Sequence, residues 1–272
     1  MMTDISSPAG SDTAALVRYE VRGGAARIDL DSPHNRNAIS GALVDQLLAA
    51  LERAAADTTA RVVVLGHTGG TFCAGADLSE ASADREDPTA AAAARTRVFL
   101  DLLTAIISHP KPVIGAVDGH VRAGGMGLIA ACDLVVAGPS STFALTEVRL
   151  GLAIAMISVP LAARVRSRDL TRAVLTGEKF DPAHAREIGL VTEAVDDVDS
   201  AVDELVASFR PCSPQGLAEN KALLATPLLA ELDARGEELA GITARLFGTP
   251  EVTEGMTAFL EKRKPSWATA IE

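Results

Sequence analysis

Residues 111–151, KPVIGAVDGHVRAGGMGLIAACDLVVAGPSSTFALTEVRLG, decide the fold of this chain. They open with an apolar, β-branched run at 113–117, which predicts a buried strand. A glycine-rich turn at 123–127 leads into the unbroken apolar run LIAAC, which predicts a buried helix, and LVVA (134–137) predicts a second strand. Strands joined through a helix in this way are typical of an α/β fold with crossover helices.

The glycine-rich turn also predicts a binding site. Glycine at Gly124 and Gly125 lets a substrate atom approach the backbone without meeting a Cβ atom. A helix that begins there directs its unpaired N–H groups and the positive end of its dipole at that atom, as in an oxyanion or phosphate site. Glu147, after the strand-like TFAL, is the acidic residue best placed beside it. A plainer interpretation stays open: the glycines could serve close helix packing, and Glu147 could be a solvated acid beside Arg149.

The N-terminal part of the chain continues the α/β pattern. Residues 16–33 predict a hairpin with its turn at Gly23 and Gly24, and Ser40 precedes a helix at 42–57. RVVVLGHTGG (61–70) predicts a buried strand with a glycine exit. A strand, a helix and a further strand at this rhythm indicate the same crossover arrangement as in 111–151.

Two segments lie between these strands and residue 111. In the loop FCAGADL (72–78), Gly75 frees the backbone and Asp77 suits the N-cap position of the next segment. The segment 81–109 begins charged and loop-like, as a mobile lid would, and then becomes a helix. Its predicted buried face carries Val98, Leu102 and Ile106.

Beyond residue 151 the chain turns helical. Helices are expected at 158–165 and 169–177, and a capped helix, a turn and a short strand over 180–195. From Asp203 onward the pattern is helical only, with breaks expected at Pro211, Pro214, Pro227 and Pro250. We therefore expect a disordered N-terminus (1–13), an α/β core (14–200) and a helical C-terminal region (201–272).

Composition excludes several classes of function. The net charge of −11 over 272 residues disfavours a nucleic-acid partner, which needs a basic face. The N-terminus lacks the features of a signal peptide, and the most apolar stretch, 150–163, is too short to span a membrane, so we expect a cytoplasmic protein. The cysteines and histidines show no metal-ligand spacing, so we expect no metal; the cysteines suit packing roles and the histidines surface roles.

Four segments in the same order resemble the crotonase (enoyl-CoA hydratase/isomerase) superfamily. They are FCAGADL, the central stretch 111–151, VLTGEKFDPAHAREIGLVTEAV (174–195) and EGMTAFLEKRKPSW (254–267). The resemblance covers the chain from about residue 16. It implies a spiral of ββα units, a C-terminal trimerisation region, and a homotrimer or dimer of trimers. It also implies an acyl-CoA thioester as substrate, with coenzyme A as part of that substrate and no separate cofactor.

The resemblance assigns roles to particular residues. The backbone N–H groups of Ala76 and Gly124 match the pair that holds the thioester oxygen. Glu147 matches the glutamate of the family's Phe-x-x-x-Glu pattern, which exchanges a proton with the α-carbon. The substrate contacts that the resemblance implies are Arg36, Ala74, Asp77, Leu78, Gly125, Phe259 and Lys262, of which Phe259 and Lys262 would meet the coenzyme A of a neighbouring subunit.

One departure from the family pattern affects the predicted reaction. Gly127 stands where the two-carboxylate hydratases carry a glutamate, so no residue is evident for activating water. A single carboxylate suffices for an enoyl-CoA isomerase, which only moves a proton. A glycine there together with FALTEVRLGL nevertheless resembles the bacterial methylglutaconyl-CoA hydratases, and AIAMISVPL (153–161) indicates a reshaped acyl pocket. We therefore expect a hydratase, with an isomerase as the alternative.

The sequence leaves two other classes of function open. GMGLIA (125–130) imitates the G-x-G-x-x-A fingerprint of an NAD-binding oxidoreductase. However, the preceding strand ends near Val117, and the polar segment 118–123 separates it from the glycines, which follow the strand closely in that fingerprint. Because one acid is missing, a non-catalytic acyl-CoA binder is the third possibility.

Overall fold

From β3 to β8 the chain winds as a spiral, and each turn of the spiral adds one strand to a large sheet and one strand to a small sheet. Within residues 14–83 and 87–269, which the computed structural model describes, the large sheet has the order β1-β2-β3-β5-β7-β9 and the small sheet the order β4-β6-β8. All neighbouring strands are parallel except β1, which is antiparallel to β2. Two turns each run from the large sheet to the small sheet and then into helix, which is the predicted ββα repeat. A third turn, β7 and β8, ends in a 3₁₀ helix.

The strands are short and the helices longer. The strands are β1 (Val17–Arg22), β2 (Ala25–Leu30), β3 (Val62–His67), β4 (Thr71–Cys73), β5 (Val113–Val117), β6 (His120–Arg122), β7 (Leu134–Ala137), β8 (Thr142–Ala144) and β9 (Glu193–Ala194). The helices are α1 (Gly41–Ala56), α2 (Leu78–Ala83), α3 (Pro88–Ile107), α4 (Gly124–Ala131), α5 (Ser158–Arg164), α6 (Ser167–Thr176), α7 (Pro182–Glu187), α8 (Val198–Phe209), α9 (Pro214–Phe247), α10 (Pro250–Leu260) and α11 (Ser266–Thr269), with 3₁₀ turns η1 (Pro33–Asn35), η2 (Glu147–Leu150) and η3 (Ala155–Ile157).

Local signals in the sequence set several of these boundaries. Gly23 and Gly24 both have positive φ, at 63° and 89°, so the hairpin turn falls where it was predicted. The Ser40 hydroxyl accepts a hydrogen bond from the backbone N–H of Leu43 and caps α1, and the Asp181 carboxylate caps α7 in the same way. The predictions of this hairpin and of both helices are confirmed.

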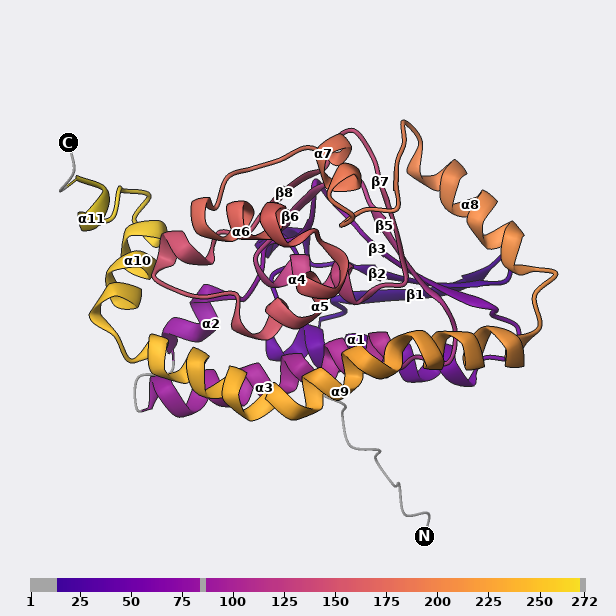
Figure 1. Cartoon of the computed structure of the whole chain (residues 1–272), viewed down its shortest axis with the longest axis horizontal. Helices are drawn as coiled ribbons and strands as arrows, with labels where there is room; N and C mark the ends of the chain where they lie inside the picture. Colours follow the sequence, from indigo (N-terminus) through magenta and orange to yellow (C-terminus); the bar gives the residue numbers. More distant parts are fainter. Residues whose placement is uncertain (1–13, 84–86, 270–272) are drawn as a thin grey trace, which may run out of the picture.

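The two faces of the large sheet are covered differently (Figure 1). Alternate strand residues such as Ile28, Leu65 and Val113 belong to the main core, shared with α1, α3 and α4. Val64 and Ile114 point the other way, where α8 packs on them. This follows from strand geometry, because successive side chains point to opposite faces. Helix α8 therefore packs directly on the sheet, and the helical section begins at Val198 rather than at Asp203.

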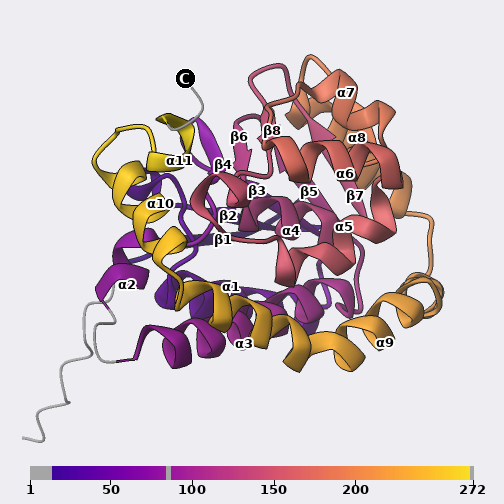
Figure 2. The same cartoon turned by 60° about the vertical axis from the view of Figure 1, so that its left-hand side comes forward.

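Helix α9 is a long C-terminal element that lies along α3, as both views of the ribbon show (Figures 1 and 2). The break expected at Pro227 is wrong, because this proline lies inside α9. Its ring removes one helical hydrogen bond, and packing against α3 maintains the helix across that gap. The C-terminal apolar residues Leu239 and Met256, at 1% and 9% exposed, are buried within the chain itself.

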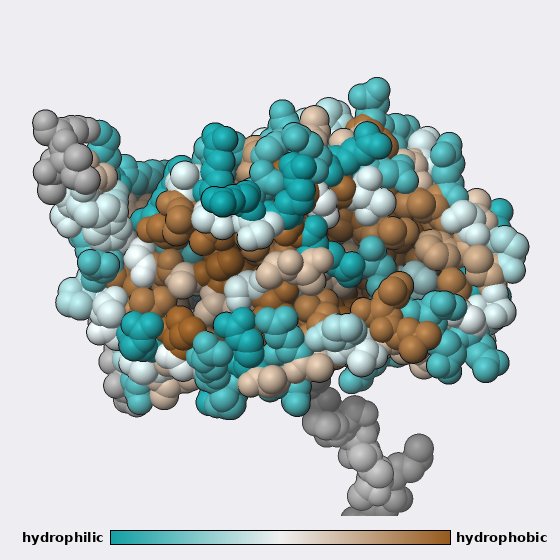
Figure 3. Space-filling view, viewed as in Figure 1, coloured by the Kyte–Doolittle hydropathy of each residue, from teal (hydrophilic) through white to brown (hydrophobic). Residues whose placement is uncertain are grey.

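Other large apolar side chains stay exposed, including Phe259 and Leu260 on α10, at 57% and 52%. Leu223 and Leu224 on α9 are 72% and 83% exposed, and Leu175 on α6 is 68% exposed. Figure 3 shows apolar side chains spread across the face that carries α5 and α9. Among the described residues, no helix combines the length and the apolarity needed to cross a membrane.

Several sequence-based expectations need correction. Two three-residue strands, β4 and β6, lie in segments expected to be a loop and a polar connection. His109 is 4% exposed and Cys212 is exposed, so the surface role expected for the first and the packing role expected for the second are wrong. In the segment 81–109, whose start was expected to be loop-like, residues 81–83 belong to helix α2 and α3 covers Pro88–Ile107. Residues 1–13, expected to be disordered, lie outside the described residues, as do residues 84–86 of the expected lid.

Candidate active site

Two backbone turns meet at the centre of the site. Gly75 has φ +90°, and a Cβ atom on it would lie 2.7 Å from the Cβ of Ala123 and 3.4 Å from the nitrogen of Gly124. Ile39 holds this loop in place, since its N–H donates to the Gly75 carbonyl (2.8 Å) and its own carbonyl accepts from the N–H of Asp77 (3.1 Å). Only glycine at position 75 permits this approach and this φ.

The N–H groups of Ala76 and Gly124, one from each turn, donate to no protein acceptor within the described residues. Gly124 is the first residue of α4, where helical geometry leaves N–H groups unpaired. Ala123 before it has φ 48° and ψ −121°, a conformation that L-residues rarely adopt and that costs about 1–3 kcal/mol. Packing of the two turns against each other maintains this strained residue, and both N–H groups belong to residues that line one cavity.

That cavity has a volume of about 330 Å³ and a mostly apolar wall. The wall comes from α1, α3, the segment from Leu150 to Ile157, and the ends of α9 and α10. Among the described residues the wall contains two carboxylates, Asp77 and Glu147, and one cation, Arg95. An apolar cleft with a few polar groups is the usual form of a small-molecule site.

Glu147 is the buried acid of this cavity. It is the first residue of η2, directly beyond β8, and it is 9% exposed. Burial raises the pKa of Glu147 from 4.5 to about 7, because the low-dielectric surroundings disfavour the charged form. Its Oε2 atom has no hydrogen-bond partner in the protein. A carboxyl group with this pKa exists in both protonation states near neutral pH and can both accept and donate a proton.

The interior of α4 contributes no second acid. Gly127 faces η3, and a Cβ atom on it would lie 2.3 Å from Cγ2 of Ile157. Asp77, the other carboxylate of the wall, accepts hydrogen bonds from the N–H groups of Ser79 (3.0 Å) and Glu80 (3.3 Å). Asp77 therefore caps the start of α2, as predicted, and its oxygens are already engaged.

The structure brings most of the predicted site residues together. Of the predicted site residues, those that line the cavity are Ala74, Ala76, Asp77, Leu78, Gly124, Glu147 and Phe259. The other three lie outside its wall. Gly125 packs on Cys73, since a Cβ on it would lie 2.8 Å from the Cβ of Cys73. Arg36 and Lys262 are exposed residues with positive φ, at 61° and 56°.

Sequence reasoning missed several lining residues. Ala92, Arg95, Thr96 and Phe99 recur at helical spacing on α3 and face the cavity together. The spacing was present in the sequence, but the predicted buried face of α3 carried Val98, Leu102 and Ile106. Leu102 and Ile106 are buried in the main core, whereas Val98 is 39% exposed and lines the cavity, so its predicted burial is wrong. Thr146 and Thr243 were also missed, because no pattern distinguishes a threonine that faces a cavity from one that faces a neighbouring helix.

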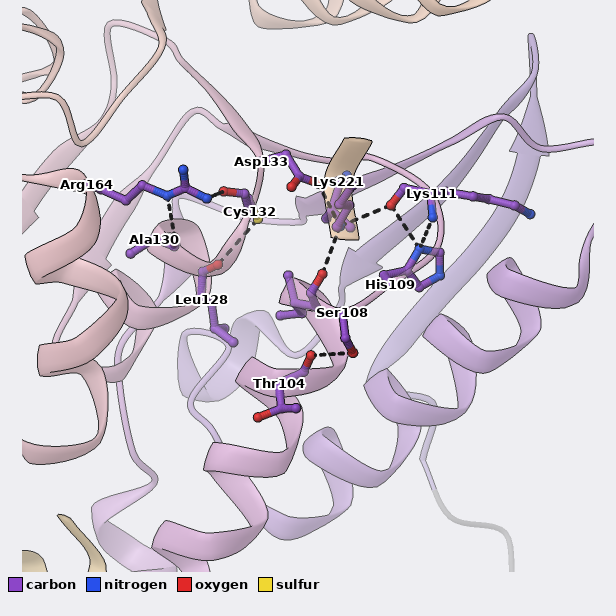
Figure 4. A network of polar contacts seen from close by, with 12 residues as sticks. Thr104, Ser108, His109, Lys111, Leu128, Ala130, Cys132, Asp133, Arg164 and Lys221 are labelled. Carbon is purple, nitrogen blue, oxygen red and sulfur yellow. Dashed lines mark hydrogen bonds and ion pairs between the residues drawn. The ribbon is translucent and has the colours of Figure 1, made fainter. Parts of the chain in front are cut away.

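A buried polar network lies at the other end of α4 (Figure 4). The Lys221 ammonium on α9 donates to Asp133 Oδ2 (2.7 Å) and to the carbonyls of Ile106 (3.0 Å) and Lys111 (3.1 Å). Asp133 also accepts from the N–H of Val113 at the start of β5 (2.7 Å). Burial lowers the pKa of Lys221, and the carboxylate of Asp133 opposes that shift. The network joins α9 and α3 to the ends of the two strands that flank α4, β5 before it and β7 after it.

Two further contacts complete this network. Arg164 of α5 donates to the carbonyls of Ala130 (3.3 Å) and Cys132 (3.4 Å), which satisfies acceptors at the end of α4. His109 lies with Nε2 3.1 Å from the carbonyl of Leu51 and Nδ1 3.1 Å from the N–H of Lys111. Burial lowers the pKa of His109, which suits a neutral imidazole that donates once and accepts once.

Comparison with known proteins identifies the family. The sequence model of the enoyl-CoA hydratase/isomerase family matches residues 20–270. The chain belongs to this family. A crystal structure of an enoyl-CoA hydratase from Mycobacterium avium is 51% identical, with a TM-score of 0.87, over 94% of this chain and 100% of that chain. The 2,3-dehydroadipyl-CoA hydratase of Escherichia coli is 32% identical over 88% of this chain and 93% of its own length.

A more distant neighbour extends the comparison of fold. Methylmalonyl-CoA decarboxylase, solved in complex with 2-nitronate-propionyl-CoA, is 24% identical with a TM-score of 0.77, over 93% of this chain and 98% of that chain. At this identity the likeness shows the fold alone. The predicted crotonase-like fold and membership of the superfamily are thus confirmed.

Proposed function

We propose that this protein is an enoyl-CoA hydratase, which adds water across the 2,3 double bond of an acyl-CoA thioester. The observation that carries the proposal is Glu147: a carboxyl group with a pKa of about 7 in an apolar cavity that also contains two unpaired backbone N–H groups. Hydration needs one group that exchanges a proton and a second group that stabilises negative charge on the thioester oxygen.

The charge is stabilised by the N–H groups of Ala76 and Gly124. When a nucleophile adds to the β-carbon, the double-bond electrons move toward the thioester carbonyl and its oxygen becomes an enolate oxygen. Two preorganised donors in a dry site each stabilise that charge by roughly 2.7–4 kcal/mol, by analogy with other oxyanion holes. Coenzyme A is part of the substrate in this scheme, and no separate cofactor takes part.

One carboxylate is enough for the whole addition. Ionised Glu147 takes a proton from water while the water oxygen forms a bond to the β-carbon, and the π electrons of the double bond move to the enolate. The protonated Glu147 then donates the same proton to the α-carbon, and the enolate electrons form the new C–H bond. The product is the 3-hydroxyacyl-CoA, and Glu147 returns to its ionised form, so one group with a pKa near 7 suffices for both steps.

A second candidate is an enoyl-CoA isomerase. The observation that favours it is the contact between Gly127 and Ile157, which excludes a second acid from that position. An isomerase removes a proton from one carbon and returns it to another, so Glu147 alone meets its needs. The E. coli relative is named a hydratase, and we rank hydration first.

One experiment separates the candidates. The protein is incubated with matched 2-enoyl- and 3-enoyl-CoA esters of several chain lengths in H₂¹⁸O, and the masses of the products are measured by mass spectrometry. A hydratase converts 2-enoyl esters to 3-hydroxyacyl esters that contain ¹⁸O at the β-carbon. An isomerase interconverts the two enoyl esters with no ¹⁸O uptake. No turnover of any ester, despite binding, would support a non-catalytic acyl-CoA binder, and retention of NADH would revive the oxidoreductase hypothesis.

We also propose a homotrimer or dimer of trimers. The support is the exposure of Leu223 and Leu224, since large apolar side chains gathered on one surface mark association sites. In such an assembly Phe259 and Lys262, near the end of α10, would meet the coenzyme A of a neighbouring subunit, and Arg36 would lie near its phosphates. A monomer in sedimentation at micromolar concentration would contradict the assembly.

A further inference from the structure

Thr146 immediately precedes Glu147 and has an unusual side-chain arrangement. It occupies the N-cap position of η2, where a threonine hydroxyl normally accepts a hydrogen bond from the first turn of the helix. Here the side chain makes no capping bond, and only the carbonyl is used, accepting from the N–H of Arg149 at 3.0 Å. Thr146 is half-buried and lines the cavity. Its hydroxyl therefore has no partner in η2, and the residue that carries it belongs to the cavity wall.

The other hydroxyl side chains of the cavity wall are already engaged. Ser40 accepts from the N–H of Leu43 at 3.3 Å. Thr96 and Thr243 donate to carbonyls one turn back in their own helices, at 2.8 and 3.1 Å. Within the described part of the chain, the Thr146 hydroxyl makes no hydrogen bond to protein, so it differs from the rest of this set.

We propose that Thr146 is the water-positioning residue of the hydration step, an inference that rests on the proposed hydratase function. The nucleophilic water donates one hydrogen to the Glu147 carboxylate and the other to the Thr146 oxygen, which has lone pairs available to accept it. With both hydrogens held, one lone pair of the water oxygen is directed at the β-carbon.

Bonds and protons in the hydration step still balance when Thr146 is included. The water O–H bond that faces Glu147 breaks, its proton passes to the carboxylate, and the oxygen lone pair forms the new C–O bond. The second O–H bond stays intact and becomes the hydroxyl of the product, still hydrogen-bonded to Thr146. A contact that orients the reacting water without exchanging a proton acts through geometry, and its loss costs about 10- to 100-fold in rate.

This role predicts a selective defect. Glu147 can exchange the α-hydrogens of a saturated acyl-CoA with solvent without any nucleophilic water. Thr146→Val keeps the shape of the side chain and removes the hydroxyl. Hydration of the 2-enoyl-CoA ester that the wild-type protein turns over best should fall by about 10- to 100-fold in kcat, with KM little changed. Exchange of the matching saturated ester in D₂O should stay within about threefold of wild type. Thr146→Ser, which restores a hydroxyl, should recover most of the hydration rate.

The possible outcomes distinguish a failure of the role of Thr146 from a failure of the proposed hydratase function. Wild-type protein that exchanges α-hydrogens but hydrates no 2-enoyl ester would overturn the hydratase function, and Thr146's role with it. Hydration that survives Thr146→Val within about threefold would overturn the role of Thr146 alone. An equal loss of hydration and exchange in a folded Thr146→Val protein would also overturn it, because the residue would then act on Glu147 or on the fold. Should Thr146→Val fail to fold, Thr146→Ala removes the hydroxyl without the added methyl group and takes its place.

Discussion

A Cβ atom on Gly127 would lie 2.3 Å from Cγ2 of Ile157 and 3.0 Å from its Cβ. Helix α4 and η3 therefore pack at this distance only because position 127 has no side chain. Ile157 is 1% exposed and belongs to the main core, so it has little room to move. The packing of η3 on α4 thus leaves no room for a second acid at position 127. A glutamate placed there would require the removal of Ile157 as well.

Gly127→Ala should destabilise the protein by about 1–3 kcal/mol, because the added methyl group overpacks the contact with Ile157. The loss appears despite the roughly 1 kcal/mol that alanine gains over glycine in a helix. Urea unfolding measures it. The matched control is Gly241→Ala in α9, where nothing lies within 4 Å of the added Cβ and stability should hold or rise. Equal stability of both variants would mean that the Gly127 contact relaxes at no cost.

The stability of Glu147→Gln relative to wild type should increase as pH rises. The pKa of Glu147 is about 7 in the folded state against 4.5 for an unperturbed carboxyl, so the folded state binds the proton more tightly than the unfolded chain. Wild-type stability therefore falls as pH rises from about 4.5 through 7, while the glutamine is unaffected. The difference in unfolding free energy between variant and wild type should grow by about 1–2 kcal/mol from about pH 6 to about pH 8.5. A difference that does not change with pH would mean that the carboxyl is not buried as described.

Lys221→Met should cost about 2–4 kcal/mol of unfolding free energy, because it leaves the Asp133 carboxylate without its buried partner. Adding Asp133→Asn should recover part of that loss, since the uncompensated charge is then gone. Arg97→Met breaks the exposed pair with Glu237 on the same two helices, α3 and α9, and is the control, with little change expected. If Lys221→Met and Arg97→Met behave alike, the network does not anchor α9.

Gly124→Pro and Gly124→Ala form a pair that tests the oxyanion donor. Both add a Cβ atom, which would lie 2.8 Å from the flexible end of Ile39, but only proline removes the N–H group. Position 124 is the first residue of α4, where proline is tolerated. Turnover should be about 10²–10³-fold lower in the proline variant than in the alanine variant. Similar turnover in the two folded variants would exclude the Gly124 N–H group as a donor.

Much of the fold could be predicted because local chemistry and tertiary structure agree. The Gly23–Gly24 turn and the Ser40 cap each have one strongly preferred local structure, and the burial of the strand at 113–117 agrees with its composition. Strands β4 and β6 could not be predicted in this way. Each has three residues, too few for a period of two to be visible, and each exists because the spiral places it beside its neighbours.

The candidate site could be predicted where it depends on backbone. Gly75 is required by the close approach of two turns, and glycine is a visible signal of such an approach. The side chains of Arg95 and Thr146 carried no comparable signal, because their orientation depends on how α3 and η2 pack around the cavity. His109 was misassigned for a similar reason: its burial depends on backbone partners contributed by α1 and by the segment before β5.

The most direct test of the central claim compares Glu147→Gln with wild type in the hydration of the best 2-enoyl-CoA ester. Glutamine keeps the shape of the side chain but cannot accept a proton and return it. If Glu147 is the proton carrier, kcat falls by about 10²–10⁴-fold while acyl-CoA affinity, measured by calorimetry, changes little. A folded Glu147→Gln protein with near-normal turnover would contradict the account and would mean that another residue carries the proton.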